Sequence, residues 1–321
     1  MRIGFIGGHG HHYLRAALEG NEAAFAGDGH DNDQARQLAK SLGVSAWFDD
    51  PVSLLEKFKP DVVSVGAVYA YNGDICAEAL ERDVPVVSDK PIASTWAQLE
   101  RLRRLCPGRV LLTEFHLRCQ PAYRAAQKAI ADGRIGQVIQ ATAQTSYRWG
   151  QRPSWYADRK SYGGTLLWIG SHGIDAVSWV TGLQPIRVTG LQGKLCKITE
   201  DHVAVLTEMS GGATALTHAD FLRPDSAATH GDDRLRVAGS EGVLEIRDGR
   251  CMLTTRTTPQ TDITDSVSVQ PMHLELLAGV RGESEWYSTS LSLATAEVLL
   301  KARDATDSQQ WFNLTPASDR K

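Results

Sequence analysis

The stretch of sequence that decides the fold is MRIGFIGGHG, residues 1–10. Its apolar run, Arg2–Ile6, predicts a buried strand, and the glycines after it predict a tight turn. From here to about residue 115, short apolar runs alternate with helical patterns. Because this alternation is typical of strand–helix–strand crossovers around a parallel sheet, we expect an α/β fold for the first part of the chain.

The turn after the first strand is a candidate phosphate-binding site. A helix is predicted at His12–Leu18, and backbone N–H groups at a helix N-terminus bind pyrophosphate. The candidate cofactor-binding residues of the turn are Gly7, Gly8, His9, Gly10 and His11. The G-x-G-x-x-G spacing is incomplete, because His9 stands at the second glycine when the motif starts at Gly7. A tight turn that binds no ligand is the alternative interpretation.

The second strand, expected at Ala23–Ala26, is followed by acidic residues. Asp28 and Asp31 are the candidates for holding the ribose hydroxyls of a dinucleotide. No lysine or arginine lies between Arg15 and Arg36 to receive a 2′-phosphate. The sequence therefore favours NAD over NADP as the cofactor.

The pattern along the chain predicts two domains. The first has helices at 32–42, 52–58, 72–82 and 96–105, and strands at 61–65, 84–87 and 110–113. The second has a helix at 120–132 and longer alternating strands at 138–147, 186–191, 202–209, 214–220, 235–238 and 243–246, with a hairpin turn at Gly211-Gly212. Such strands predict a mainly antiparallel sheet with one solvated face. We place a nucleotide-binding domain at 1–118 and a substrate-binding and oligomerisation domain at 119–321, with a helix at 290–306 that packs back on the first domain.

Composition narrows the classes of function. A net charge of −4 and a pI near 6.2 argue against a nucleic-acid-binding protein. No apolar stretch reaches the ~18 residues of a membrane helix, and Met1–Ile6 is too short for the core of a signal peptide. Five scattered cysteines, and histidines at 9, 11, 12 and 30 with no framing cysteine or carboxylate, lack the spacing of a metal site. We expect a cytoplasmic protein with no bound metal and no membrane partner.

Two short motifs carry candidate catalytic residues. Ser88-Asp89-Lys90-Pro91 follows the apolar run at 84–87. The segment Gly163–Asp175 places His172 and Asp175 on one face of a predicted helix. Taken singly, a lysine–proline pair after a strand usually marks a surface turn, and a histidine in a helix is usually structural.

Together with the N-terminal turn, these motifs resemble those of the glucose–fructose oxidoreductase / inositol dehydrogenase (Gfo/Idh/MocA) family. Segments 118–123, 132–136 and 237–242 match the family in the same order, so the resemblance covers nearly the whole chain. It implies a Rossmann dinucleotide-binding domain followed by an α/β domain with an open, mainly antiparallel sheet. It also implies NAD(P)-dependent redox chemistry on a sugar, polyol or related small molecule, in a homodimer or homotetramer.

The resemblance implies an active site in which Lys90 and His172 meet over the nicotinamide. Neutral His172 would take the proton of a substrate hydroxyl as hydride leaves the same carbon, and Lys90 would hydrogen-bond that oxygen. Asp175 would orient the imidazole or bind a neighbouring hydroxyl. Tyr69 and Pro91 are further candidates for contacts with the cofactor.

The aromatic segment between residues 147 and 168 predicts the wall of a substrate pocket. It holds six aromatic residues interleaved with basic ones, of which Tyr156, Arg159 and Trp168 are the candidates for substrate contacts. Core packing is the alternative interpretation. Trp168 stands four residues before His172, where many polyol dehydrogenases of the family carry Asp, so the resemblance leaves the substrate open.

Three functions fit these residues. The first is an NAD-dependent dehydrogenase acting on a CH–OH group of a sugar or polyol. The second is an enzyme that cleaves or epimerises glycosides through transient oxidation by tightly held NAD. The third is a protein that binds the cofactor without catalysis. Two departures permit it: Trp168, and residues 68–72 where the family commonly has a Pro-Asn pair.

Overall fold

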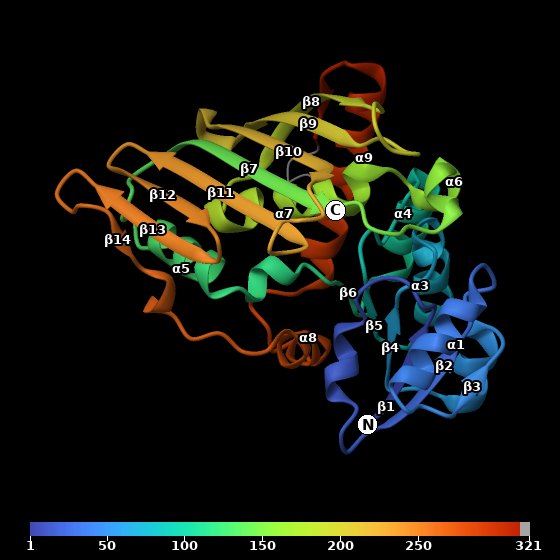
Figure 1. Ribbon diagram of the computed structural model, residues 1–321. Coiled ribbons are helices and arrows are strands. Elements are labelled where there is room, and N and C mark those ends of the chain that lie inside the picture. The colour runs from blue at the N-terminus through green and yellow to red at the C-terminus, as the bar shows by residue number, and fades with distance from the viewer. Residues whose placement is uncertain (315–321) are drawn as a thin grey trace. The chain divides into compact units, whose positions relative to one another are not determined.

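The computed structural model describes residues 1–314, which form two compact units (Figure 1). Unit 1 comprises residues 1–115, 160–163 and 270–296. Unit 2 comprises residues 116–159, 164–269 and, of the described residues, 297–314. Within residues 1–314, no helix is both long enough and apolar enough to cross a membrane.

Unit 1 is a Rossmann fold built on a parallel sheet. Its strands are β1 (Arg2–Ile6), β2 (Glu22–Ala26), β3 (Trp47–Phe48), β4 (Val62–Val65), β5 (Val86–Ser88) and β6 (Leu111–Thr113), in the order β3-β2-β1-β4-β5-β6. Its α-helices are α1 (Asn32–Ser41), α2 (Pro51–Ser53), α3 (Asn72–Leu80), α4 (Trp96–Leu105) and α8 (Met272–Val280). The strand order reverses between β1 and β4, and doubly wound sheets bind their ligands at the carboxyl ends of the strands at such a point.

The helix predicted at His12–Leu18 is wrong. The chain there forms a five-residue 3-10 helix, Tyr13–Ala17. His12 before it has a φ of 43° and a ψ of 57°, in the left-handed region, which interrupts helical geometry. The segment after the glycine turn is thus 3-10 rather than α-helical, and the pyrophosphate site expected at this turn stays a prediction.

Unit 2 contains a mixed, mainly antiparallel sheet of nine strands, which confirms the predicted class. The strands are β7 (Val138–Arg148), β8 (Pro185–Gly193), β9 (His202–Met209), β10 (Thr214–Arg223), β11 (Gly231–Gly239), β12 (Gly242–Arg247), β13 (Arg250–Thr255), β14 (Thr261–Asp262) and β15 (Phe312–Asn313). β10 and β7 are parallel neighbours, and the other pairs are antiparallel. The predicted Gly211-Gly212 turn joins β9 to β10, and both glycines have positive φ values.

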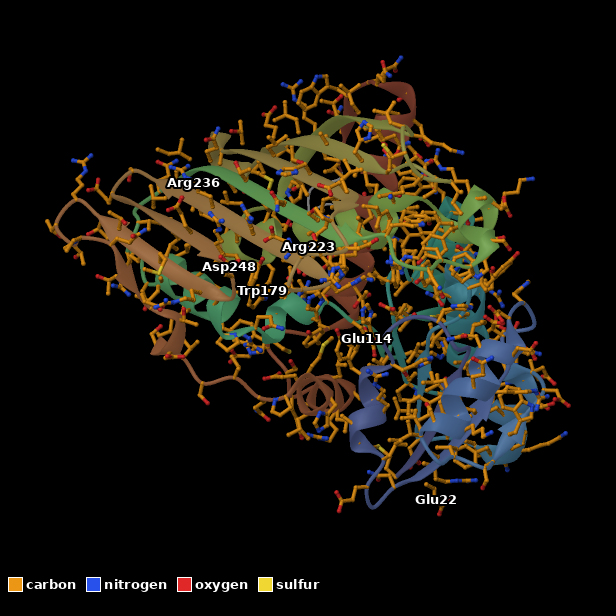
Figure 2. The ribbon with its side chains drawn as sticks, viewed as in Figure 1. Glu22, Glu114, Trp179, Arg223, Arg236 and Asp248 are labelled. Carbon is orange, nitrogen blue, oxygen red and sulfur yellow. The ribbon has the colours of Figure 1, made fainter. Side chains whose placement is uncertain are left out.

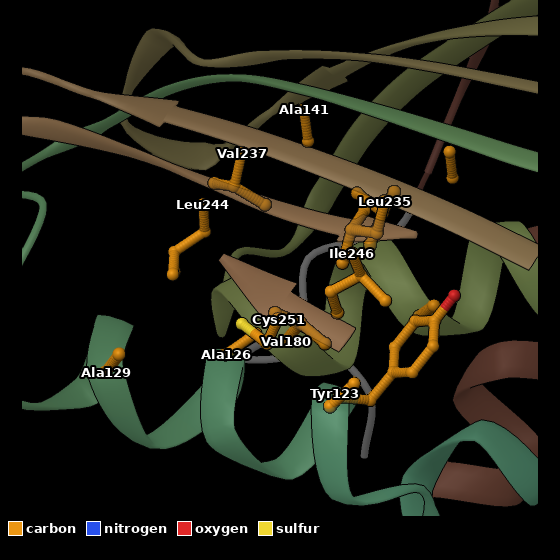
Figure 3. Close-up of a cluster of buried hydrophobic side chains, with 14 of the residues drawn as sticks. Tyr123, Ala126, Ala129, Ala141, Val180, Leu235, Val237, Leu244, Ile246 and Cys251 are labelled. Carbon is orange, nitrogen blue, oxygen red and sulfur yellow. The ribbon is translucent and has the colours of Figure 1, made fainter. Parts of the chain in front are cut away.

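The core of unit 2 lies between one face of this sheet and two helices, α5 (Pro121–Ala131) and α7 (Ser171–Thr181). Strand residues alternate, so that Ala141, Leu235 and Leu244 are buried on the helix side (Figure 3). Ala126 of α5 and Val180 of α7 belong to the same buried cluster (Figure 3). Burial of this face fixes the register of the strands and the position of α7, which carries His172.

The late helix α9 (Thr289–Ser308) contributes to both units. In unit 1, the hydroxyls of Thr289 and Ser292 accept hydrogen bonds from the backbone N–H groups of Leu111 and Thr113. In unit 2, the Asp307 carboxylate accepts hydrogen bonds from Arg159. The remaining helical segments are α6 (Arg159–Tyr162), the π-helical turns Leu54–Phe58 and Leu166–Gly170, and the 3-10 turns Tyr69–Tyr71, His116–Cys119, Ser154–Ala157, Ser210–Gly212 and Thr264–Ser266.

Candidate functional site

The glycine turn of unit 1 closes onto the ends of β2 and β4. The Gly7 N–H donates to the Ala26 carbonyl at 3.0 Å, and the His9 N–H donates to the Gly66 carbonyl at 2.7 Å. Gly7 has a φ of 86°, and a Cβ there would lie 2.5 Å from the Gly66 carbonyl oxygen. Position 7 therefore requires glycine, and the turn lies where the strand order reverses.

His12 fixes this turn from inside the unit. Its imidazole is fully buried, with Nδ1 at 2.8 Å from the Ser64 hydroxyl and Nε2 at 3.2 Å from the Gly7 carbonyl oxygen. Burial lowers the pKa of His12 to about 4. The neutral ring donates through Nε2 to the carbonyl oxygen and accepts through Nδ1 from Ser64.

Asp89 links the turn to Lys90. One carboxylate oxygen accepts from the His11 N–H at 2.9 Å and lies 3.1 Å from His11 Nδ1. The other oxygen accepts from the Lys90 N–H at 2.8 Å and lies 3.8 Å from Lys90 Nζ. Burial alone would raise the pKa of Asp89, but Lys90, His11 and these hydrogen bonds lower it to about 2. A Cβ on Gly10 would lie 2.3 Å from the same carboxylate, so the turn, Asp89 and Lys90 form one packed group.

Glu114 is a buried acid that the sequence reasoning missed. It follows β6 and is labelled in Figure 2, and its Oε1 accepts from the Tyr13 N–H at 3.1 Å. Burial, and then the charge of Asp89, raise the pKa of Glu114 well above its ordinary value. This shift favours the protonated form of Glu114, which adds no second negative charge near Asp89 and Lys90. Its only sequence signal was an acid directly after an apolar strand.

The two acids predicted to bind ribose have different surroundings. Asp28 is buried and accepts from three backbone N–H groups at 2.8 Å each, those of His30, Asp31 and Val68. Asp31 caps α1 and lies 2.8 Å from His9 Nε2. Asp28 thus organises the end of β2, whereas Asp31 presents a more exposed carboxylate beside the turn.

Asn72 joins the loop after β4 to the Lys90 segment. Its side-chain oxygen accepts from the Ala67 N–H, and its amide donates to the carbonyl oxygens of Asp89 and Pro91, both at 3.3 Å. Tyr69, predicted to contact the cofactor, is buried in unit 1, with its ring centroid 6.2 Å from that of Tyr162. Asn72 therefore ties the loop after β4 to the backbone on both sides of Lys90.

This edge of unit 1 suits a dinucleotide. The strand order reverses here, Gly7 leaves no room for a side chain, and acids stand at the end of β2. Lys90 is buried at the end of β5. Over the described residues, no group of three or more metal-ligating side chains converges. The residues that would hold NAD are the backbone of 7–11, Asp31, Tyr69 and the 90–91 segment.

In unit 2, His172 lies in the first turn of α7 among polar aromatic side chains. It is buried, and the His116 ring meets it edge-on with centroids 4.5 Å apart. The Tyr147 ring centroid lies 6.2 Å away, at the end of β7. The sequence reasoning placed His172 correctly on a helix but missed His116, since it lies 56 residues earlier in the numbering and matches no motif.

Asp175, one turn along α7, is engaged by Arg118. Both are buried, with Arg118 Nε at 3.0 Å from one carboxylate oxygen and a terminal nitrogen at 2.5 Å from the other. This two-pronged geometry is the strongest form of a carboxylate–guanidinium pair. The pair therefore ties α7 to the 3-10 turn His116–Cys119, which contains Arg118. Lys90 belongs to unit 1 and His172 to unit 2, so their meeting over one ring stays a prediction.

The three predicted substrate contacts differ in exposure. Tyr156 is buried against Trp149 and Trp155, and Trp168 is buried in the π-helical turn before α7. Arg159 is partly exposed and pairs with Asp307 at 2.8 Å. The packing of Tyr156 is that expected of a core residue, whereas Trp168 lies close in sequence to His172.

Comparison with known proteins identifies the family. Residues 1–112 match the model of the oxidoreductase family GFO_IDH_MocA with an NAD-binding Rossmann fold, and residues 123–245 match the model of the GFO/IDH/MocA C-terminal domain. The chain therefore belongs to the GFO/IDH/MocA family of oxidoreductases, and its Rossmann domain is of the NAD-binding class. The family resemblance of the motifs is confirmed.

Curated relatives act on sugars and polyols. A D-glucoside 3-dehydrogenase from Escherichia coli K12 is 32% identical over 162 residues, 48% of this chain and 45% of that protein. An NAD⁺-dependent scyllo-inositol 2-dehydrogenase from Bacillus subtilis is 27% identical over 224 residues, 66% of this chain and 63% of that protein. Each match spans less than two thirds of the relative. Among solved structures, a candidate oxidoreductase from Thermotoga maritima is 28% identical with a TM-score of 0.91, covering 98% of this chain and 100% of that one.

Proposed function

We propose that this protein is an NAD-dependent oxidoreductase that removes hydride from a CH–OH carbon of a sugar, polyol or glycoside. The observation that carries the proposal is the buried Lys90–Asp89 pair, which His11 contacts and which packs against the glycine turn of an NAD-binding Rossmann fold. A lysine that only marked a surface turn would be exposed to solvent. Lys90 and the Asp89 carboxylate beside it are both buried. The polyol and glucoside dehydrogenases among the relatives support the substrate class.

The residues of the chain divide the chemistry as follows. NAD, when bound, supplies the hydride acceptor. His172 accepts the proton of the reacting hydroxyl as a general base. Lys90 hydrogen-bonds the same oxygen and offsets the charge that develops on it. Asp89 keeps Lys90 protonated and oriented, and the neutral form of Glu114 leaves that charge balance undisturbed.

Asp175 is proposed as a positioning residue in this scheme. Its carboxylate is occupied by the Arg118 guanidinium, which holds the first turns of α7 and therefore the backbone of His172. The alternative role of Asp175, a direct contact with the substrate, is less well supported, because both carboxylate oxygens already accept from Arg118. Trp168, one turn before His172, is proposed to shape the pocket.

The proposal is tested by turnover on a panel of polyols and glycosides that includes scyllo-inositol and a methyl D-glucoside. We expect NADH formation at 340 nm with at least one of them. His172→Gln and Lys90→Met should each lower kcat by about 10²–10⁴, with NADH binding retained. His218→Gln on the open sheet face is the matched control and should leave kcat unchanged. Sugar release or epimerisation without net NADH would favour transient oxidation, and NAD binding without turnover by the whole panel would contradict the proposal.

We also propose that two copies associate through the open face of the unit 2 sheet. Leu206 of β9 and Leu216 of β10 are cross-strand partners on that face, and each is 41% exposed. Leu191 of β8 adds a third exposed leucine. Contiguous exposed apolar patches of this kind often mark surfaces through which proteins associate.

A further inference from the structure

A polar cluster next to His172 has no role in the scheme above. It consists of His116, Tyr147, His230 and Asp233, all in unit 2. The Tyr147 hydroxyl donates to the Asp233 carboxylate, with both oxygens at 3.0 Å. His116 Nε2 lies 3.9 Å from Asp233, and the His230 ring meets Tyr147 edge-on at 5.5 Å.

The strands bring this cluster together from distant parts of the sequence. Tyr147 is the last residue but one of β7, and Asp233 lies near the start of the neighbouring β11, with Gly231 paired to Tyr147. A Cβ on Gly231 would lie 2.6 Å from the Tyr147 ring, so glycine at that position lets the phenol lie flat along the strand. His116 comes from the 3-10 turn that opens unit 2 and contacts the His172 ring.

The cluster has the chemistry of a hydroxyl-binding site. A carboxylate offers several lone pairs, so Asp233 can accept from a ligand hydroxyl in addition to Tyr147. A neutral imidazole provides one donor and one acceptor, and a phenol oxygen also accepts. Tyr147 and His230 add ring faces for the C–H side of a sugar. The side chains of His116 and Asp233 are 20% and 17% exposed, so a small ligand can reach polar groups that are still mostly desolvated.

We propose that His116, Tyr147 and Asp233 form a subsite that binds the hydroxyl next to the one oxidised at His172, and so select ring polyols and sugars with vicinal hydroxyls. The proposal rests on the proposed function, because it assigns the reacting hydroxyl to His172. Trp168 stands four residues before His172, and Asp233 supplies an acid to this cluster from β11.

The test compares Asp233→Asn and Tyr147→Phe with the wild-type protein on scyllo-inositol, a methyl D-glucoside and their deoxy analogues that lack one neighbouring hydroxyl. Losing a hydrogen bond to a charged group should raise KM by about 10- to 100-fold, with kcat changed by less than about threefold. Wild type should discriminate against the deoxy analogues, since buried polar groups reject a ligand that leaves them unpaired. The variants should lose that discrimination.

Asp232→Asn is the matched control, because Asp232 is the neighbouring acid on β11 and pairs with Arg223 and Arg234. It should leave KM and discrimination unchanged. Calorimetric titration of each probe into the NADH-bound protein gives affinity without turnover, so it separates loss of the subsite from failure of the proposed function. Unchanged affinity and discrimination in both Asp233→Asn and Tyr147→Phe would overturn the subsite. Tyr147→Phe keeps the ring in place and serves if Asp233→Asn fails to fold.

Discussion

At the scale of single residues, the glycine turn is held by His12, whose burial favours the neutral imidazole. His12 is fully buried, and its two ring nitrogens contact Ser64 and the Gly7 carbonyl oxygen. A protonated ring could not accept from the Ser64 hydroxyl. Burial, which lowers the pKa of His12 to about 4, therefore favours the neutral ring at the turn that would receive the cofactor.

The burial of His12 makes the free energy of unfolding depend on pH. The pKa of His12 falls from 6.5 in the unfolded chain to about 4 in the folded unit. Between pH 6.5 and 4 the unfolded chain takes up a proton that the folded unit does not, so the free energy of unfolding decreases by about 3 kcal/mol and then levels off. Above pH 6.5 the contribution is constant, because both states are neutral.

Urea unfolding of wild type and His12→Asn at several pH values measures the effect. Asparagine tolerates the left-handed backbone at position 12 and does not titrate. The stability difference between the two proteins should therefore shrink by about 3 kcal/mol from pH 7 to pH 4. His30→Asn, at an exposed histidine, is the control and should keep the wild-type slope. A parallel pair of curves for wild type and His12→Asn would show that His12 titrates normally.

Residues of this kind limit what the sequence can reveal. Lys90, His172 and the glycines were found from motifs, because their spacing along the chain is local. His12, Asn72 and Glu114 act through contacts with residues 52, 17 and 101 positions away, respectively. Such contacts exist only once the parallel strands bring their carboxyl ends to one edge, so the local sequence gives little sign of them beyond the acid that follows an apolar strand at Glu114.

At the scale of elements, α7 is held by one buried ion pair. Removing Arg118 would leave the Asp175 carboxylate buried without its cation, which costs about 3–5 kcal/mol. Arg118→Met should therefore lower the free energy of unfolding by that amount in urea titrations. Lys128→Met is the matched control, because the Lys128–Asp132 pair on α5 is exposed, and such pairs contribute less than about 1 kcal/mol. A loss for Arg118→Met as small as that of the control would mean that α7 does not depend on the pair.

The elements themselves were predicted to different degrees. The helix at 96–105 and the strand at 202–209 match α4 and β9 in both bounds, because their periodic patterns are long and have clear ends. The two-residue strands β3 and β15 were missed, since two residues carry no period. The helix after the glycine turn was predicted wrongly because His12–Leu18 has helical composition. The left-handed backbone at His12 interrupts a helix there, and composition does not indicate it.

At the scale of the whole molecule, the open sheet face predicts self-association. Arg236, labelled in Figure 2, lies in the same cross-strand row as Leu216 and Leu206, so the row runs from charged to apolar across the sheet. Leu206→Glu combined with Leu216→Glu places two like charges in the apolar part, which a second copy could not bury.

Light scattering coupled to size-exclusion chromatography gives the mass of the assembly and tests this prediction. Wild type should elute as a dimer or larger assembly, and the double variant should have the mass of one chain. Leu274→Glu, at an exposed leucine of α8 in unit 1, is the control and should leave the mass of the assembly unchanged. A monomeric wild type, or a double variant that still associates, would contradict association through this face.

The central claim is that hydride passes from a substrate carbon to the nicotinamide. It is tested most directly by incubating the wild-type protein with NAD⁺ and a polyol or glycoside carrying deuterium on its CH–OH carbons, then weighing the cofactor by mass spectrometry. Hydride transfer predicts reduced cofactor one mass unit heavier, formed at a rate that deuterium lowers and that falls by about 10²–10⁴ in His172→Gln. Cofactor that never acquires deuterium from any member of the panel would contradict it.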